Sequence, residues 1–395
     1  MPTDGRSIYV AGAGIAGLTL ALALAKFGLR VVVLERQAEV SEFGAGLQIS
    51  PNAFRILDRL GLGEAIAEAS LEPVGIDIFP SGAAQPLTTL ELGPVMRERF
   101  AAPYVVMHRA DLAEVLFQAT RRFANIEILF GVESWRVESR DKAATVTLRQ
   151  GGMDQSLPAH AWIGADGVHS PTRREALTGP DARYFGRVAW RALVPEESVA
   201  KQVRLDRVTV LFGPGYHVVC YPLPHRAEVN LAMFITAGDP QVAPGSQPAV
   251  PGRPSARVQS VLDAAAGRWT PWPLFAVDTP VWNRGRIGLI GDAAHAMVPF
   301  QAQGAAMAIE DAAVLAPLLA GDDRPESALA RYAALRQARV ARVARTSRMN
   351  GTIFHLPWPL SIGRDLVIKM AGPRGQLQRL GWLYGYDAEI AGARP

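Results

Sequence analysis

Short apolar runs alternate with alanine- and leucine-rich stretches at the start of the chain. Residues 7–11 predict a buried strand, and the stretch after a glycine-rich turn predicts a helix that ends near Phe27. Gly28 stands where a helix stop is expected. The β-branched run 29–34 is typical of a strand buried on both faces of a parallel sheet. The chain therefore opens with strand, glycine turn, helix and strand.

The same patterns predict the elements that follow. Further helices are expected over 51–60, 110–123, 257–266, 304–319 and 328–350. Further strands are expected over 126–129, 135–139, 144–149, 208–212, 217–221, 228–235 and 287–290. Between about 183 and 276, successive antiparallel strands replace the alternation of strand and helix.

This change of pattern predicts three parts of the chain. A nucleotide-binding domain is expected over 1–75, 101–182 and 277–325. A β-rich domain over 76–100 and 183–276 interrupts it. A helical segment over 326–395 completes the chain. A length of 395 residues fits two or three domains.

Composition limits the classes of protein. With 49% hydrophobic and 20% charged residues, the chain is neither disordered nor fibrous. A formal net charge of +4 without a basic block predicts no nucleic-acid partner. The single cysteine, Cys220, excludes an intrachain disulfide or a CxxC pair. It indicates a reducing compartment, most simply the cytoplasm.

Two stretches have competing interpretations. Residues 8–25 carry no charge, as in a membrane span or a signal segment, but early glycines and the lack of a preceding basic cluster argue against both. We therefore expect no membrane partner. A row of arginines at every third position winds around the helix expected over 328–350, which favours a solvated or interface helix over an anion-binding surface. The row consists of Arg336, Arg339, Arg342, Arg345 and Arg348.

The first turn carries the pattern GxGxxG, formed by Gly12, Ala13, Gly14, Ile15, Ala16 and Gly17. Its glycines allow a tight bend, close approach of a pyrophosphate, and packing of helix on strand. The helix N-terminus then offers free N–H groups to the phosphates. Glu35 ends the second strand, where a carboxylate can accept both ribose hydroxyls. This context favours a dinucleotide site over a turn that serves packing alone.

Two later motifs each follow an apolar strand. GADGVHS at 164–170, followed by Arg173, places Asp166 at the carboxyl end of one strand, and GDAAH at 291–295 places Asp292 at another. Ligands bind at this edge of open parallel sheets. The 395 residues hold no second GxGxxG, which argues against a reductase with two nucleotide domains.

These motifs, in this order and spacing, resemble those of the single-component FAD-dependent aromatic hydroxylases, which share the para-hydroxybenzoate hydroxylase fold. The resemblance covers nearly the whole chain. It implies an α/β fold in which a β-rich substrate domain interrupts a Rossmann-type FAD-binding domain, with a C-terminal helical segment. The H-x-x-x-Y-P arrangement at 217–222 is similar to that of the salicylate, 3-hydroxybenzoate and 6-hydroxynicotinate hydroxylases.

The resemblance also implies contacts with FAD. Glu35 would hold the adenosine ribose, with Arg36 by the adenine and Ser134 nearby. Gly304 and Ala305 open a helix whose N–H groups would face the flavin edge on which negative charge develops. The other positions implied are Gln48 beside the isoalloxazine, Arg109 at the FAD linker, Asp166, Asp292 and Pro299.

The implied reaction is a monooxygenation. NADH or NADPH would reduce FAD, with NADH favoured by the resemblance alone. Reduced FAD would capture O2 as a C4a-hydroperoxide and transfer one oxygen to a small hydroxylated aromatic or N-heteroaromatic acid. The protein would exclude water and help the phenol to lose its proton. Attack at a carboxyl-bearing carbon would expel CO2.

His217 and Tyr221 face one side of their strand and can converge on one ligand. A histidine that titrates near pH 6.5 can take a phenolic proton directly or through the tyrosine. A purely structural pair is the alternative. Substrate contacts are also expected from Gln48, Arg191, Pro299 and Gln303, with Arg191 either covering the flavin or holding a substrate carboxylate.

Other interpretations stay open. In one interpretation, the substrate is a larger polycyclic or isoprenoid compound. In another, the chain is a non-catalytic FAD-binding carrier or regulatory protein. A halogenase is disfavoured because residues 269–273 do not match W-x-W-x-I-P. Monomer and homodimer both fit. No metal is expected, because no ligand spacing involves His108, His160, His169, His225 or His355.

Overall fold

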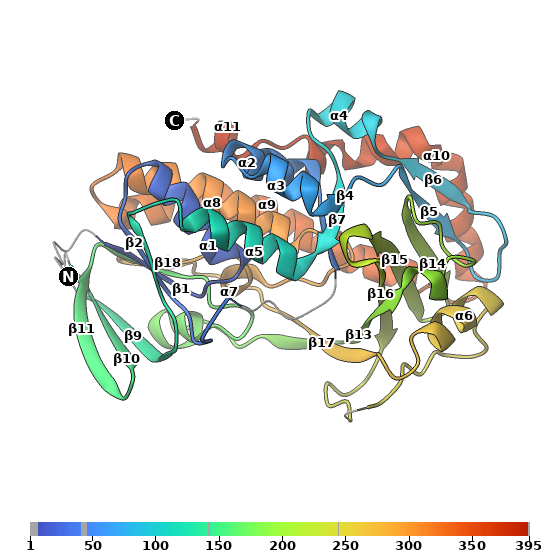
Figure 1. Cartoon of the computed structure of the whole chain (residues 1–395), viewed down its shortest axis with the longest axis horizontal. Coiled ribbons are helices and arrows are strands. Elements are labelled where there is room, and N and C mark those ends of the chain that lie inside the picture. Colours follow the sequence, from blue (N-terminus) through green and yellow to red (C-terminus); the bar gives the residue numbers. More distant parts are fainter. Residues whose placement is uncertain (1–6, 41–45, 141–142, 244, 394–395) are drawn as a thin grey trace.

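The computed structural model describes residues 7–40, 46–140, 143–243 and 245–393. It is an α/β protein with two large sheets side by side (Figure 1). The first sheet has the order β18–β19–β12–β1–β2–β8, and its strands are parallel except for the β18–β19 pair. These strands are β1 (Ile8–Ala11), β2 (Val31–Leu34), β8 (Ile126–Leu129), β12 (Ala161–Gly164), β18 (Asn283–Arg284) and β19 (Ile287–Leu289).

Helices cover one face of this sheet (Figure 1). They are α1 (Ile15–Lys26), α5 (Arg109–Thr120), α8 (Gly304–Gly321) and α9 (Pro325–Phe354). The uncharged stretch 8–25 forms β1 and most of α1, and both are buried. Its lack of charge therefore follows from its place in the core. A three-stranded sheet lies at the left-hand end of the molecule in Figure 1. It consists of β9 (Val132–Arg140), β10 (Ala143–Gln150) and β11 (Met153–Ala159).

The second large sheet has the order β17–β13–β16–β15–β14–β5–β6. Even-numbered residues of β15, such as Val218 and Cys220, pack with Val258 and Val261 of helix α6. Odd-numbered residues of β15 point to the opposite face, since side chains alternate along a strand. The elements are β5 (Gly75–Phe79), β6 (Thr88–Glu91), β13 (Arg183–Pro195), β14 (Val208–Gly213), β15 (Tyr216–Leu223), β16 (Glu228–Thr236), β17 (Thr270–Ala276) and α6 (Ala256–Ala264).

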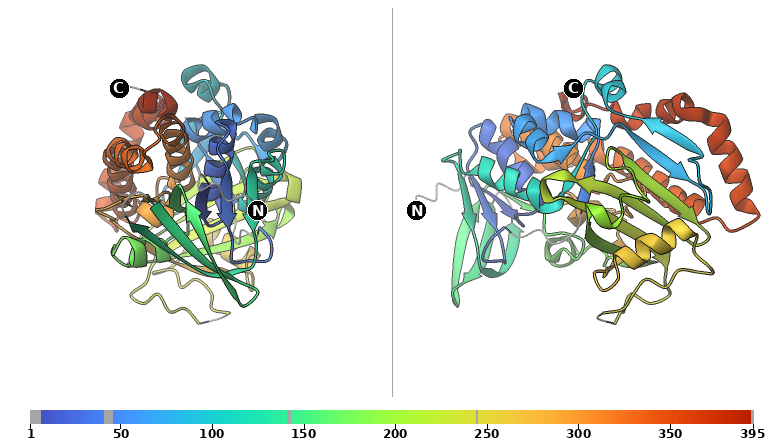
Figure 2. Two further views of the ribbon diagram at one scale, coloured as in Figure 1. Left: turned by 90° about the vertical axis from the view of Figure 1, so that its left-hand side faces the viewer. Right: turned by 45° about the vertical axis from the view of Figure 1, so that its right-hand side comes forward.

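A small sheet of order β3–β7–β4 and several short helices complete the fold. Helix α10 (Leu360–Tyr384), which the sequence pattern did not delimit, runs along the edge strand β6 (Figure 2). The α/β class and the C-terminal helices are confirmed, whereas the division into domains stays a prediction. The remaining elements are β3 (Gly46–Ile49), β4 (Ser70–Leu71), β7 (Val105–His108), α2 (Pro51–Arg59), α3 (Gly63–Glu68), α4 (Pro94–Phe100), α7 (Asp292–His295) and α11 (Ala388–Ala393).

The arginine row departs from its expected exposure at Arg336. This side chain is fully buried, and its guanidinium lies 2.7 Å from Glu310 Oε2 and 2.8 Å from Asp311 Oδ1. Arg339 binds the same Glu310 at 2.7 Å, and His295 Nε2 lies 2.6 Å from Asp311 Oδ2. Burial is possible because paired carboxylates on α8 compensate the charge. The prediction of a solvated or interface row is therefore wrong at Arg336.

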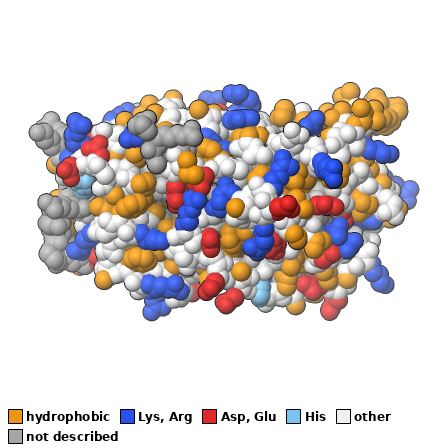
Figure 3. Space-filling model, turned by 90° about the horizontal axis from the view of Figure 1, so that it is seen from above, with side chains coloured by type: hydrophobic (Ala, Val, Ile, Leu, Met, Phe, Trp, Pro, Cys, Tyr) orange, Lys and Arg blue, Asp and Glu red, His pale blue; other side chains and the backbone are white. Residues whose placement is uncertain are grey.

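The surface seen from above mixes positive and negative side chains, and apolar ones gather at the end formed by α10 (Figure 3). In the described part of the chain, α8 alone is long and apolar enough to cross a membrane. Two thirds of α8 (67%) is buried inside the protein, as in the core helix of a globular fold.

Candidate active site

A cavity of about 1140 Å³ is lined by residues from both halves of the molecule. It brings together most of the residues that the sequence singled out. These are Gly14, Ile15, Ala16, Gln48, Arg109, Arg191, His217, Tyr221, Asp292, Pro299, Gly304 and Ala305. Others lie off its walls, namely Gly12, Ala13, Gly17, Glu35, Arg36, Ser134, Asp166 and Gln303.

The glycine turn is built so that no side chain fits at two of its positions. Gly12 has a φ of +103°, and a Cβ on it would lie 2.6 Å from the Ala165 carbonyl oxygen. A Cβ on Gly17 would lie 1.9 Å from the Gly12 carbonyl oxygen. Because the turn is packed this tightly, α1 begins directly at the cavity. Its first backbone N–H groups can bind a phosphate there. This cradle fits the pyrophosphate of a dinucleotide.

Glu35 supports this turn from the end of β2. Its Oε2 accepts a hydrogen bond from Ala13 N at 2.9 Å, and its Oε1 accepts one from Gln37 N at 2.9 Å. Arg36 lies next to it, with its guanidinium 5.1 Å from the ring of Trp135, the neighbour of Ser134. These groups extend from the glycine turn toward β9, as an adenosine group would.

Arg173 joins the two aspartate motifs. It is fully buried and donates to the carbonyl oxygens of Val168 at 2.6 Å and Ala293 at 2.9 Å. Asp166 accepts hydrogen bonds from Thr172 N at 2.9 Å and Thr172 Oγ1 at 2.7 Å. Its carboxylate thus shapes the turn instead of facing the cavity. Asp292, at the start of α7, lines the cavity.

Helix α8 points its N-terminus into the cavity through Gly304 and Ala305. Gln303 turns away, since its amide donates to Ser50 Oγ at 2.8 Å and accepts from Asn52 Nδ2 at 3.1 Å. Of the two glutamines just before α8, Gln301 is the one that lines the cavity. The first free N–H groups of α8, and not the Gln303 side chain, therefore face the cavity.

Gln48 is held by a tyrosine that the sequence analysis missed. Tyr104 Oη donates a hydrogen bond to Gln48 Oε1. Burial raises the pKa of Tyr104 well above its ordinary value, so the hydroxyl stays protonated and keeps donating. Tyr104 precedes β7, and only the pairing of β7 with β3 brings it to Gln48.

The odd-numbered residues of β15 form one wall of the cavity. His217, Val219 and Tyr221 all line it, as the alternation along a strand requires. The His217 ring stacks on Phe234, with ring centroids 4.6 Å apart. Burial lowers the pKa of His217 well below its ordinary value and raises that of Tyr221. Both side chains are therefore neutral near pH 7.

His217 has a partner that sequence reasoning missed. Its Nδ1 lies 2.8 Å from Nε2 of His355, a buried residue directly after α9. The two histidines are 138 residues apart, so no spacing rule connects them.

Arg191 lies on β13 and lines the cavity with its guanidinium 5.7 Å from the ring of Trp272. Among the described residues, none forms an ion pair with it. Burial lowers its pKa, and the nearby Tyr221 opposes this effect. A guanidinium without an acidic partner at a cavity wall is suited to bind a carboxylate.

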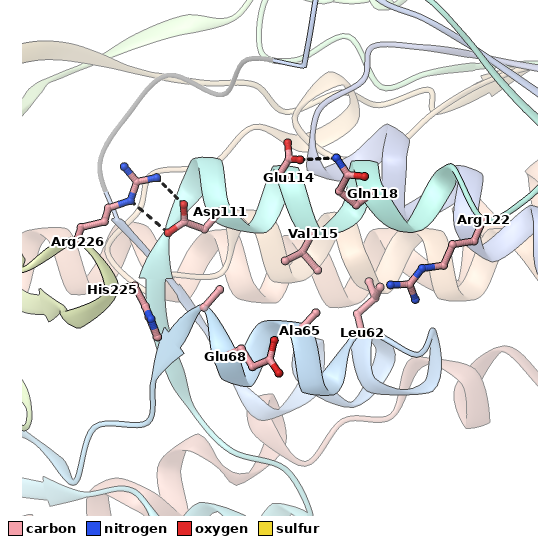
Figure 4. Close-up of a pocket in the computed structure, with 11 residues that line it drawn as sticks. Leu62, Ala65, Glu68, Asp111, Glu114, Val115, Gln118, Arg122, His225 and Arg226 are labelled. Carbon is pink, nitrogen blue, oxygen red and sulfur yellow. Dashed lines mark hydrogen bonds and ion pairs between the residues drawn. The ribbon is translucent and has the colours of Figure 1, made fainter.

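A second, shallower groove of about 550 Å³ lies between α3 and α5 (Figure 4). Its charges are mixed, and Asp111 of α5 pairs with Arg226 at one end of it. It contains none of the predicted site residues. Within the described parts of the chain, no cluster of three or more His, Cys, Asp or Glu side chains could hold a metal ion.

Comparison with known proteins identifies the family. The profile of the family described as FAD binding domain matches residues 6–347. The chain is 37% identical to 3-amino-4-hydroxybenzoate 2-monooxygenase PtmB3 of Streptomyces platensis, over 98% of both chains. It is 33% identical to 3-hydroxybenzoate 6-hydroxylase 1 of Aquipseudomonas alcaligenes, over 96% of this chain and 98% of that protein.

The fold is similar to that of a solved salicylate hydroxylase substrate complex, with a TM-score of 0.78 and 24% identity over 98% of this chain and 97% of the other. The resemblance seen in the sequence motifs is thereby confirmed. The chain belongs to the FAD-binding family of flavoprotein monooxygenases that includes the aromatic acid hydroxylases.

Proposed function

We propose that this protein uses FAD, NAD(P)H and O2 to hydroxylate a small aromatic or N-heteroaromatic acid that already carries a hydroxyl group. The observation that carries the proposal is the shared cavity. The glycine turn, the α8 N-terminus and the polar residues of the second sheet all reach it. Relatives named for hydroxybenzoates over nearly the whole chain support the same substrate class.

The residues present fit FAD as an extended ligand. In the proposal, Gly12, Gly14 and Gly17 shape the pyrophosphate cradle, and Arg109 and Asp292 contact the linker. Glu35, Arg36 and Ser134 serve the adenosine end. Gln48, Pro299, Gly304 and Ala305 serve the flavin end, and Asp166 acts through the turn that it holds. When bound, FAD supplies electron transfer from NAD(P)H and the activation of O2.

The substrate occupies the face of β15 and β13. Arg191 binds the carboxylate, and His217 and Tyr221 hydrogen-bond the ring hydroxyl. Both of the latter are neutral, so their contribution is to favour the ionised hydroxyl, which makes the ring more nucleophilic. Phe234 and Phe300 supply apolar walls that exclude water. The Gln303 amide is hydrogen-bonded to Ser50 and does not line the cavity. In this proposal Gln301 therefore replaces Gln303 as the polar neighbour of Pro299.

Several finer points belong to the same proposal. NADH is the favoured co-substrate, and the enzyme works in the cytoplasm as a monomer or homodimer, without a nucleic-acid or membrane partner. Size-exclusion chromatography with light scattering distinguishes monomer from dimer. Parallel assays with NADH and NADPH decide the co-substrate.

The decisive experiment measures NADH oxidation by the FAD-loaded protein with a panel of hydroxybenzoates and hydroxypyridine carboxylates. Hydroxylated product and H2O2 are quantified in the same samples. We expect at least one acid to accelerate NADH oxidation and to appear hydroxylated. Acceleration with H2O2 alone marks an effector that is not a substrate. No response to any small acid contradicts the substrate class and favours a larger substrate or a carrier.

A further inference from the structure

The two buried histidines, His217 and His355, are within hydrogen-bonding distance of each other. Which of them donates the hydrogen bond determines which nitrogen of His217 carries a proton. His217 on β15 lines the cavity, whereas His355 lies behind it and does not. The 2.8 Å contact between His217 Nδ1 and His355 Nε2 requires one proton between the two nitrogens. This contact leaves Nε2 as the nitrogen of His217 that is available to a molecule in the cavity.

Two tautomeric arrangements satisfy this contact. If His217 donates from Nδ1, His355 must carry its own proton on Nδ1. That atom is buried and has no hydrogen-bond partner among the described residues. If His355 donates from Nε2, its Nδ1 is a bare lone pair instead. A buried N–H group without an acceptor is rarer, and costs more free energy, than a buried lone pair without a donor. The arrangement in which His355 donates from Nε2 is therefore favoured.

The surrounding charges keep both rings neutral, as each of the two arrangements requires. The positive charges of Arg187 and Arg364 lower the pKa of His355, and the charge of Arg187 also lowers the pKa of His217. Nearby positive charge disfavours the protonated, charged form of an imidazole. Together with burial, these cations lower the pKa of His355 to about 3 and keep both rings neutral.

The rings are also held in place. His217 stacks on Phe234 and meets Phe300 and Phe354 edge-on, with centroids 5.5 and 5.3 Å away. A ring flip would bring Nδ1 out of reach of His355. The aromatic contacts thus keep the same nitrogen toward the cavity.

We infer that His355 is a positioning residue that donates its Nε2–H to His217 Nδ1 and so presents His217 Nε2–H to the cavity as a hydrogen-bond donor. His217 then stabilises an anionic oxygen, such as a phenolate, and does not serve as the acceptor of a phenolic proton. This second statement rests on the proposed function, whereas the tautomer does not. It revises the role that the sequence indicated for His217.

The first test is nitrogen-15 NMR of the histidine side chains in the FAD-loaded protein without substrate. Spectra of His217→Gln and His355→Gln assign the signals by their loss. We expect both rings to be neutral, protonated at Nε2 and bare at Nδ1. Protonation of His217 at Nδ1, or exchange between both tautomers, overturns the inference. This result does not depend on any hydroxylation.

The second test measures the ionisation of a bound hydroxybenzoate by ultraviolet difference spectra of the oxidised protein. His355→Leu removes the donor, and we expect the ratio of bound phenolate to phenol to fall about tenfold. His355→Gln keeps an N–H donor and should restore most of this ratio. The control is His225→Gln at an exposed site. An unchanged ratio in His355→Leu overturns the inference. If no acid is hydroxylated while NMR finds the expected tautomer, only the proposed function fails.

Discussion

The ring of Tyr221 lies directly against the backbone of Gly46. A Cβ on Gly46 would come within 2.4 Å of Tyr221 Cε2 and 2.6 Å of its hydroxyl oxygen. Gly46 N also donates to Asn230 Oδ1 at 2.8 Å, and Asn230 is the cross-strand partner of Tyr221. The small sheet and the seven-stranded sheet therefore meet at a cavity residue, and only glycine allows this approach.

Gly46→Ala should displace the Tyr221 ring. We expect about 1–3 kcal/mol lower stability from overpacking and a fall in kcat/KM of about 100-fold, because small misplacements in a site are costly. Hydroxylation kinetics and chemical denaturation measure the two effects. The matched control is Gly238→Ala, where an added methyl group meets open space. Turnover equal to that of the control would show that Tyr221 is not needed in this position.

Arg191→Met should weaken the binding of aromatic acids. A hydrogen-bonded ion pair contributes about 1.5–3 kcal/mol, so we expect the Kd of a hydroxybenzoate to rise about 10- to 100-fold. The corresponding phenol without a carboxylate should bind equally to both proteins. Titrations followed by flavin absorbance measure both. Arg204→Met, at an exposed ion pair with Asp206, is the control. Equal losses for acid and phenol would exclude Arg191 as the carboxylate ligand.

Gly17→Ala should abolish FAD binding. The new Cβ would lie 1.9 Å from the Gly12 carbonyl oxygen, and neither backbone can move without opening the turn. We expect purified protein without the flavin absorbance of the parent. Gly381→Ala in α10 adds the same methyl group in open space and should keep full flavin content. A flavin-loaded Gly17→Ala protein would contradict the proposed cradle.

Arg336→Met should destabilise the protein strongly. Its removal leaves Asp311 and Glu310 buried with fewer partners, which typically costs about 3–5 kcal/mol. Urea denaturation of the FAD-loaded protein measures this loss. The comparison is Arg348→Gln, which breaks a pair with the exposed Asp278 and should cost at most about 1 kcal/mol. Equal effects of the two variants would mean that the α8–α9 cluster contributes no more than a surface pair.

The histidine pair should make folding stability depend on pH. Folding lowers the pKa of His355 to about 3, whereas the unfolded chain binds that proton near pH 6.5. Above pH 6.5 both states are neutral at this residue, and no linkage exists. As the pH falls below 6.5, only the unfolded chain gains the proton, so stability falls by up to about 1.4 kcal/mol per pH unit until the folded pKa is reached.

His355→Asn should therefore flatten the curve of unfolding free energy against pH between pH 6 and 4.5, by about one proton. Denaturation at several pH values measures the slope. His225→Gln, at an exposed site, serves as control. A slope equal to that of the parent would mean that His355 is not held neutral by burial.

Much of the candidate site follows from local patterns. The strand, glycine turn and helix at the N-terminus are encoded by apolar runs and by glycines at fixed offsets, so Gly12 and Gly17 are readable without a structure. The alternation along β15 likewise indicates that His217 and Tyr221 share a face. Periodicity works here because backbone geometry dictates which neighbours in sequence lie on one side.

The residues that contact these side chains could not be predicted from local sequence patterns. His355 meets His217 across 138 residues, and Gly46 meets Tyr221 from a different sheet. The choice of Gln301 over Gln303, and the burial of Arg336, were equally undetermined. The sequence by itself determined the local elements and the faces of each. The packing of distant elements decided which side chains touch, because burial, charge pairing and hydrogen-bond satisfaction are settled only when those elements come together.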